Sequence, residues 1–122
     1  MPAGVNDQPG DARVVVITLS GALDLAAQRR LTADLSEAVG DRSRELVIDL
    51  RAVTFIDSSA LGVLVHAHQQ LQRQGRAMAC VLSDGPVRRL LEVTRMEEQL
   101  LVFETPEEAS SHLRRAAEQA LS

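Results

Sequence analysis

Two adjacent serines follow an aspartate in the stretch TFIDSSALGVLV, and they raise the first chemical question about this chain. Asp57 directly precedes an apolar helical run, so its carboxylate can cap the free amide hydrogens of the first turn. Ser58 and Ser59 then occupy that turn, where the unsatisfied amides and the positive end of the helix dipole favour an anion such as phosphate. The same residues could also do no more than start a helix, and composition alone leaves both interpretations open.

A catalytic role for these serines lacks the usual partners. A hydrolase elbow requires G-x-S-x-G, which does not surround Ser58. A serine nucleophile also needs a base, but His66 and His68 lie further along the expected helix and point away from its N-terminus. Their i, i+2 spacing places them on different sides of the helix, so we expect surface or boundary residues and no metal site.

Nucleotide-binding motifs are missing from the sequence as well. Neither G-x-x-x-x-G-K-S/T nor G-x-G-x-x-G occurs, so we expect no cofactor and no binding of ATP by the chain itself. Any phosphate on a serine would therefore arrive from another protein. We expect that the protein is not an enzyme.

Composition excludes several classes of partner. The formal net charge is −4 and the aromatic residues are two Phe with no Tyr or Trp, which does not suit nucleic-acid binding. The longest apolar runs are much shorter than the ~20 residues of a membrane-spanning helix, and no signal-peptide pattern opens the chain. The single Cys80 lies in the apolar run MACVL, where we expect a small buried hydrophobic residue. A cytoplasmic protein without a membrane partner fits these features best.

The pattern of apolar residues predicts one α/β domain. Residues 1–12 mix Gly, Pro, Asn and Asp without a period, which predicts a mobile tail before a domain over 13–122. Beyond it, β-branched runs alternate with segments of helical spacing, such as Leu25, Leu31, Leu35 and Val39. The expected elements are strands over 13–21, 45–50 (strand-like to 56), 76–82 and 100–104, and helices over 24–39, 58–74, 85–94 and 106–121.

Alternating strands and helices imply right-handed crossovers and a mainly parallel sheet, whose sites form beyond the carboxyl ends of its strands. Asp24 follows the end of the first strand, so it would lie at the same edge of the sheet as Asp57, and its simplest role is to cap the first long helix. Ser83 and Asp84, in SDGP, form the third strand-end loop and would flank the serines, although a plain turn is an equal interpretation.

At this point the sequence resembles a known family. The segments LSGALDLAA (19–27), LVIDLRAVTFIDSSALGVLV (46–65) and GPVRRLLEVT (85–94) are similar to the anti-anti-sigma factors, which are single STAS domains of bacteria. The resemblance covers about residues 13–115. Its most specific part is DSSALG, which resembles the family's DSSGLG with Ala60 in place of the usual glycine. The fold that the resemblance implies is a mainly parallel sheet of four to five strands packed against four helices.

The resemblance also implies a phosphorylation switch. In the family, the first serine after the aspartate, here Ser58, is phosphorylated by a partner that is both serine kinase and anti-sigma factor, and a PP2C-type phosphatase reverses this. The unphosphorylated protein binds the anti-sigma factor and frees the sigma factor, whereas the phosphorylated protein lets go. The partner surface implied for this chain comprises Asp24, Asp57, Ser58, Ser59, Ala60, Ser83 and Asp84.

Other functions stay open at the level of sequence. STAS domains also serve as docking subunits of transporters and stressosomes, a role that needs no phosphorylation. A small serine hydrolase ranks third, because no base is placed for the serines. We expect a monomer or a weak dimer.

Overall fold

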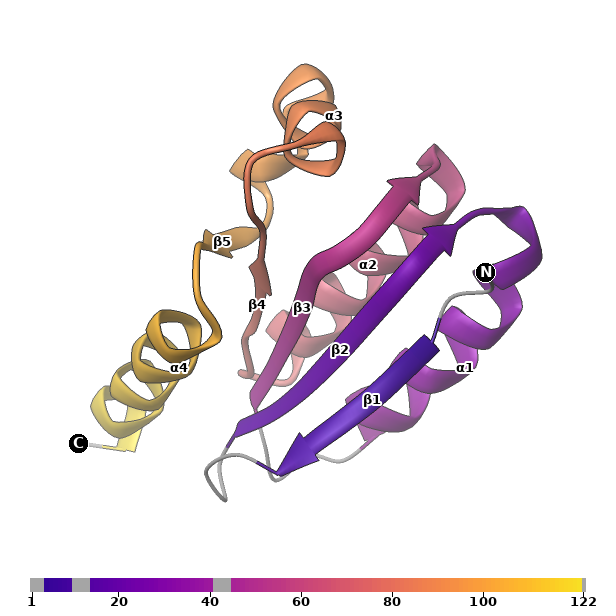
Figure 1. Ribbon diagram of the computed structural model, residues 1–122. Helices are drawn as coiled ribbons and strands as arrows, with labels where there is room; N and C mark the ends of the chain where they lie inside the picture. The colour runs from indigo at the N-terminus through magenta and orange to yellow at the C-terminus, as the bar shows by residue number, and fades with distance from the viewer. Residues whose placement is uncertain (1–3, 10–13, 41–44, 122) are drawn as a thin grey trace.

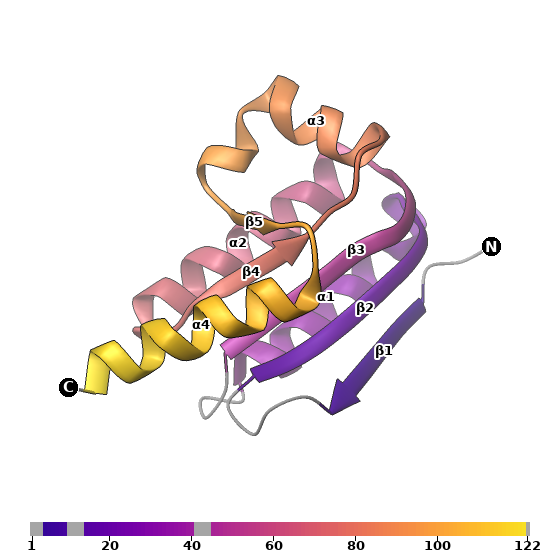
Figure 2. The ribbon, with the colours of Figure 1, turned by 60° about the vertical axis from the view of Figure 1, so that its left-hand side comes forward.

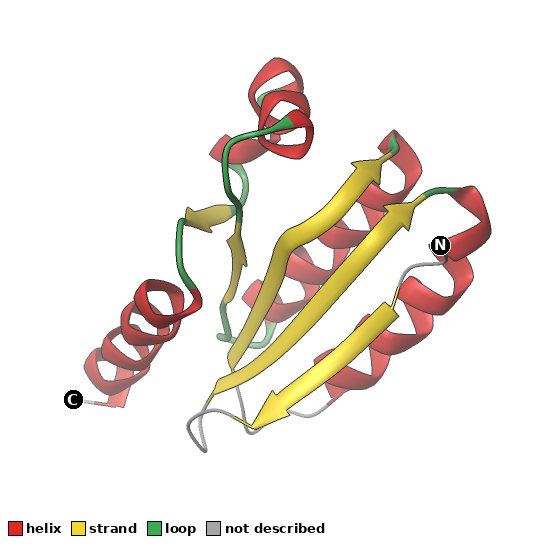
Figure 3. Ribbon diagram, viewed as in Figure 1, coloured by secondary structure: helices red, strands yellow, loops and turns green. Residues whose placement is uncertain are grey.

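Strands and helices alternate along the chain in the computed structural model, which describes residues 4–9, 14–40 and 45–121 (Figure 1). The strands are β1 (Gly4–Pro9), β2 (Val14–Leu23), β3 (Glu45–Ile56), β4 (Met78–Val81) and β5 (Leu101–Phe103). The helices are α1 (Leu25–Gly40), α2 (Ser58–Arg73), α3 (Pro86–Thr94) and α4 (Pro106–Leu121), and a 3₁₀ turn, η1 (Met96–Glu98), follows α3. The predicted α/β class is confirmed, and each predicted element is present within a few residues of its expected bounds (Figure 3).

The strands form one sheet in the order β1-β2-β3-β4-β5, in which β2 to β5 run parallel. Parallel neighbours need a crossover connection, and α1, α2 and α3 provide these connections along the chain. The strands β2 and β3 are the longest, and their carboxyl ends lie side by side where α1 and α2 begin (Figure 1).

The first strand differs from the sequence prediction, which placed a mobile tail over residues 1–12. Gly4–Pro9 instead pairs antiparallel with β2, from Gly4 beside Ser20 to Pro9 beside Val15. Gly, Asn, Asp and Pro are depleted in strands and give no alternating pattern, so a strand held by backbone hydrogen bonds could not be predicted here. Residues 1–3 and 10–13 lie outside the described part of the chain, and the start of the domain at residue 13 stays a prediction.

Strand β3 contains two irregularities opposite β2. From Thr18 to Ser20 the strand β2 advances by two residues, while β3 advances by three from Asp49 to Ala52. A second extra residue, Thr54, follows in β3. Extra residues of this kind are β-bulges, which bend a strand and re-aim its side chains.

The first bulge is stabilised by Asp49, whose buried carboxylate accepts a hydrogen bond from the backbone N–H of Arg51 at 3.0 Å. The Arg51 guanidinium also donates to this carboxylate, with Nη2 at 2.8 Å from Oδ2. Burial acts to raise the pKa of Asp49, but the hydrogen bonds from the Arg51 side chain and backbone, together with its charge, hold that pKa below its ordinary value. Asp49 therefore stays ionised and completes the hydrogen bonding of the bulge.

Helices cover both faces of the sheet (Figure 2). Helices α1 and α2 pack on one face, over a core of buried residues that includes Ile17, Leu19, Leu46, Ile48, Leu50, Met78 and Cys80. Helix α4 packs on the other face, through Ala109 and Leu113, over Val14, Val16, Val47, Ala79 and Val81. Figure 2 shows that α4 crosses one half of this face and leaves the carboxyl-terminal half of β3 uncovered among the described elements.

An aspartate caps the first turn of each of the helices α1 and α2. The Asp24 Oδ1 atom accepts a hydrogen bond from the Ala27 N–H at 3.1 Å, and the Asp57 Oδ1 atom accepts one from the Ala60 N–H at 2.8 Å. Asp57 has the extended backbone of an N-cap residue. The predicted capping roles of both aspartates are confirmed.

His68 and Cys80 are ionisable side chains on the buried side of α2 and in β4. His68 is 5% exposed, so its prediction as a surface or boundary residue is wrong, because it lies on the buried face of α2 between Leu64 and Leu71. Its Nδ1 atom has no hydrogen-bond partner among the described residues, and burial lowers its pKa. Cys80 is fully buried in β4, as predicted, and burial raises the pKa of its thiol to about 12.

We predict that His68 makes the stability of the protein fall in mild acid. Because its pKa is lowered in the folded state, the unfolded chain takes up a proton first as the pH falls. The contribution of neutral His68 is therefore fully present above the unfolded pKa of ~6.5 and is lost as the pH falls below it. Urea titrations between pH 7.5 and 5 should show a decrease in unfolding free energy that is smaller in His68→Leu. An equal decrease in His68→Leu and in the exposed-site control His66→Gln would contradict this assignment.

We predict that Asp57→Ala destabilises the protein by ~0.5–2 kcal/mol, because α2 loses the acceptor for the Ala60 N–H. Asp57→Asn keeps an acceptor oxygen and should cost less. Asp84→Ala serves as the control, since the Asp84 side chain is fully exposed and caps no helix in the described structure. The measurement is the unfolding free energy at pH 7. The cap is not important for stability if Asp57→Ala and Asp84→Ala unfold at the same denaturant concentration.

Candidate functional site

Two of the three predicted strand ends meet at one edge of the sheet. Leu23, the last residue of β2, lies beside Ile56, the last residue of β3. The Asp57 N–H donates a hydrogen bond to the Leu23 carbonyl at 3.2 Å, which ties the two ends together. Asp24 and Asp57 are the next residues of the two strands, so the register brings their helix caps side by side (Figure 1).

The two serines occupy the outer side of this edge. Ser58 and Ser59 are the first residues of α2, and both are exposed. No hydrogen-bond partner of either hydroxyl is found among the described residues, whereas the Asp57 carboxylate is engaged with the amide of Ala60. A group added to Ser58 would lie at the N-terminus of α2, where the helix dipole favours negative charge.

Ala60 does not lie on this surface, although the sequence predicted it as a partner contact. It is 0% exposed and belongs to the core between the sheet and the helices. The physical reason is its position in the first turn, where it follows the two outward residues and shares the buried face of Leu61 and Leu64. Direct contact of Ala60 with a partner is therefore excluded in this conformation.

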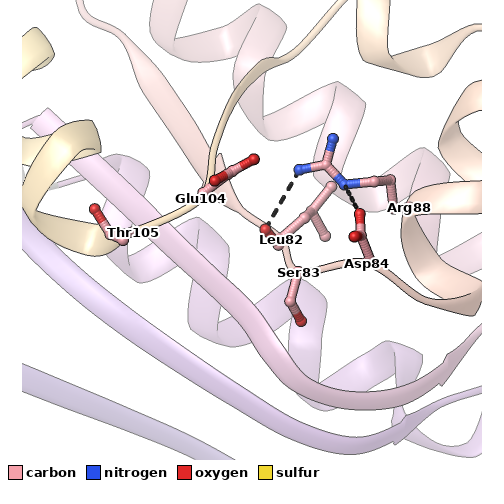
Figure 4. A pocket seen from close by; sticks show the side chains of 6 residues that line it. All are labelled: Leu82, Ser83, Asp84, Arg88, Glu104 and Thr105. Carbon is pink, nitrogen blue, oxygen red and sulfur yellow. Dashed lines mark hydrogen bonds and ion pairs between the residues drawn. The ribbon is translucent and has the colours of Figure 1, made fainter.

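Ser83 and Asp84 are exposed in the loop between β4 and α3, where they line a pocket of about 300 Å³ with Leu82, Arg88, Glu104 and Thr105 (Figure 4). Arg88 reaches across its mouth, with Nε 3.7 Å from Asp84 Oδ1 and Nη2 3.4 Å from the Leu82 carbonyl.

The loop of Ser83 and Asp84 leaves the sheet at a different level from the other two strand ends. Strand β4 ends at Val81, beside Asp49 of β3, whereas β3 continues to Ile56. The register that joins Asp24 to Asp57 therefore does not extend to Ser83 and Asp84, and their place in a common surface stays a prediction.

Neither histidine of α2 lies beside the two serines. His66 is eight residues beyond Ser58 on α2, about 12 Å along the helix axis, and His68 is buried. Within residues 4–9, 14–40 and 45–121, no three His, Cys, Asp or Glu side chains gather as metal ligands. No helix of the same described segments has the length and apolar character needed to cross a bilayer.

Sequence analysis missed two apolar side chains at this edge. Leu25 was expected on the apolar side of its helix but is 71% exposed. Six residues separate it from Leu31, which turns it about 120° away from the buried stripe at 100° per residue. Phe55, at the end of β3, is 50% exposed. The helical phase of Leu25 could have been read from the sequence, whereas the exposure of Phe55 depends on which half of the sheet α4 covers.

Comparison with known proteins places the chain among relatives of the same size. An anti-sigma F factor antagonist from Paenibacillus polymyxa is 29% identical over 101 residues, which cover 82% of this chain and 86% of the relative. The crystal structure of an anti-sigma factor antagonist from Mycobacterium paratuberculosis superimposes with a TM-score of 0.84, at 25% identity and with 92% of this chain and 94% of that one covered.

Two solved structures of lower identity share the fold. One is SpoIIAA of Bacillus in its phosphorylated form, with a TM-score of 0.67, 22% identity and 89% of this chain and 98% of that one covered. The other is the murine anion transporter Slc26a9, with a TM-score of 0.75 and 15% identity, of which this chain covers only 22% while 93% of its own length is matched.

The family model of the STAS domain matches residues 7–109, and this match accounts for every strand of the parallel sheet and for both capped helices. On this basis the chain belongs to the STAS domain family.

Proposed function

We propose that this protein is an anti-sigma factor antagonist whose unphosphorylated form binds an anti-sigma factor and thereby frees a sigma factor. The proposed partner is also a serine kinase, which phosphorylates Ser58 and so ends the binding, and a PP2C-type phosphatase restores it. The names of the relatives from Paenibacillus and Mycobacterium support the antagonist role. The protein would act by binding, without catalysis of its own, and in the cytoplasm, where sigma factors work.

The observation that carries the proposal is the exposed Ser58 on a rigid turn. Its hydroxyl has no hydrogen-bond partner among the described residues. The turn itself is fixed by the hydrogen bond from the Ala60 N–H to Asp57 and by the burial of Ala60 in the core. A kinase needs such an accessible hydroxyl, and the helix behind it keeps the backbone in one conformation. The phosphorylated form in which SpoIIAA was solved is consistent with this chemistry on the same fold.

A phosphate on Ser58 would change the binding surface more than the fold. It adds about −1.5 to −2 charges at neutral pH, next to the carboxylates of Asp57 and Asp24. The N-terminus of α2 tolerates this charge, so the domain would stay folded. A partner that approaches closely would instead meet added bulk and a concentrated negative charge, and it would be released.

The other predicted contacts complete the proposed partner surface. Asp24, Asp57 and Ser59 adjoin Ser58 at the same edge, and Ser83 and Asp84 would extend the surface toward α3. A docking subunit of a transporter or stressosome is the second candidate, because Slc26a9 contains a domain of this fold. That role would need no phosphorylation, so the experiments below separate the two.

We predict that the cognate anti-sigma factor, with Mg-ATP, adds one phosphate to Ser58 in preference to Ser59. Ser58 is the family position, and it is exposed on the first turn of α2. Peptide mass mapping of the intact protein after the reaction measures the site, and Ser58→Ala should lose the modification while Ser59→Ala retains it. Phosphate found on Ser59 alone would assign the switch to the wrong serine.

We predict that Ser58→Asp weakens binding to the purified anti-sigma factor about thirtyfold, the effect of ~2 kcal/mol at an interface hot spot. Ser58→Ala should bind like the wild type, because it removes only a hydroxyl. The melting temperature of Ser58→Asp should change little, since a carboxylate at a helix N-terminus is favourable by ~0.3–1 kcal/mol.

Calorimetric titration of each anti-sigma factor of the source organism, purified singly, provides the measurement. Ser36→Asp, at an exposed position of α1, is the matched control for added charge and should bind like the wild type. If Ser58→Asp is folded and binds as tightly as the wild type, charge at Ser58 is not the switch, and the docking role takes first place.

A further inference from the structure

The bulged half of β3 presents an exposed strip directly before the serine turn. After Leu50, the buried residues of β3 recur at every third position, at Val53 and Ile56, because each bulge adds one residue. The remaining residues of this half are all exposed: Arg51, Ala52, Thr54 and Phe55. A regular strand would expose only every second residue, so the bulges widen the exposed surface that leads to Asp57.

Exposed apolar area is concentrated at this edge of the molecule. Among the described residues, the exposed large hydrophobic side chains are Leu25 at 71%, Phe55 at 50% and Val93 at 76%. Phe55 lies beside Ala22 of β2, and Leu25 follows three residues after Ala22, so two of these three side chains flank the paired strand ends. Val93 lies instead in the last turn of α3.

We infer that Phe55 and Leu25 are apolar anchors of the partner surface, and that this surface extends from Ser58 onto the bulged half of β3. The inference rests on the proposed function and names the chemistry of the partner. The occupant is the anti-sigma factor, and the part of it that contacts Phe55 and Leu25 is apolar. Continuity argues for this occupant, because Phe55 and Leu25 come within three residues of the two aspartates that hold the serine edge.

An apolar contact beside the serines fits the direction of the proposed switch. Phe55 and Leu25 leave water only when the partner's apolar side chains approach them closely. A phosphate on Ser58 would add bulk and charge at the margin of this contact, next to the carboxylates of Asp24 and Asp57. Because the phosphate keeps its own water, it would hold the two apolar surfaces apart.

The test is calorimetric titration of the full chain with the anti-sigma factor that binds the wild type. Phe55→Ser and Leu25→Ser should each bind at least about tenfold more weakly, as expected for anchors at the centre of an interface. Phe55→Leu should retain most of the affinity. Val93→Ser is the matched control, since it removes an equally exposed apolar side chain from another element, and it should bind within twofold of the wild type. Circular dichroism and melting temperature verify that each variant is folded.

The dependence on temperature checks the chemistry of the contact independently. The heat capacity of binding should be negative in the wild type and less negative in Phe55→Ser. Wild-type affinity in folded Phe55→Ser and Leu25→Ser, or an unchanged heat capacity of binding in Phe55→Ser, would overturn the inference and leave the proposed function intact. If no anti-sigma factor binds the wild type, the proposed function fails and the inference fails with it.

Discussion

The parallel pairing of β2 with β3 along their whole length is the constraint on which the rest of this structure depends. Its last step is the hydrogen bond from the Asp57 N–H to the Leu23 carbonyl, which ends both strands at one level. Because each strand is followed at once by an aspartate that caps a helix, two helix N-termini open at the same edge. Neither aspartate could be moved along its strand without moving the start of its helix. The position of Ser58 therefore follows from the register of two strands and from the Asp57 cap, and not from a hydrogen bond of its own hydroxyl.

Within the first turn of α2, the chain passes from exposed residues to residues that are buried in the core. Ser58 and Ser59 are exposed, whereas Ala60 and Leu61 are buried in the core. A change on the outer side of such a turn can alter what the protein binds without disturbing how it packs. The small methyl of Ala60 matters for the inner side, since it fills a place in the core that a larger residue would overpack.

Much of the fold could be predicted because its signals are local. Neighbouring residues alone are enough to predict several elements. Examples are the β-branched run VVVITL, the stripe of Leu31 and Leu35, and the aspartates before two helices. What could not be predicted depends on contacts across the chain. The strand β1, for example, forms by backbone pairing with β2. The exposure of Phe55 likewise depends on the half of the sheet that α4 leaves open. The burial of His68 is different, because its helical spacing from Leu64 and Leu71 already placed it on the apolar face of α2.

The positions of the candidate residues in the fold could also be predicted in part, because their signals are local as well. Asp24, Asp57 and the two serines come from strand-end patterns, which the topology converts into one edge. Ser83 and Asp84 were assigned to that edge from their place after the third strand. The short strand β4 ends beside Asp49, however, and a strand length of this kind is set by its neighbours in the sheet. The residues that sequence analysis overlooked, Leu25 and Phe55, are apolar, and apolar residues are ordinarily assigned to a core.

The single thiol of the protein gives it a built-in reporter. Cys80 lies in the central part of the sheet with none of its surface open to water, and its high pKa leaves almost no thiolate at neutral pH. A thiol reagent can reach it only when β4 separates from its neighbours. The labelling rate therefore measures how often this part of the sheet opens. Since the sequence has one cysteine, the signal comes from one place without any engineering. Oxidants that act only on exposed thiols would likewise not reach Cys80 while the sheet is closed.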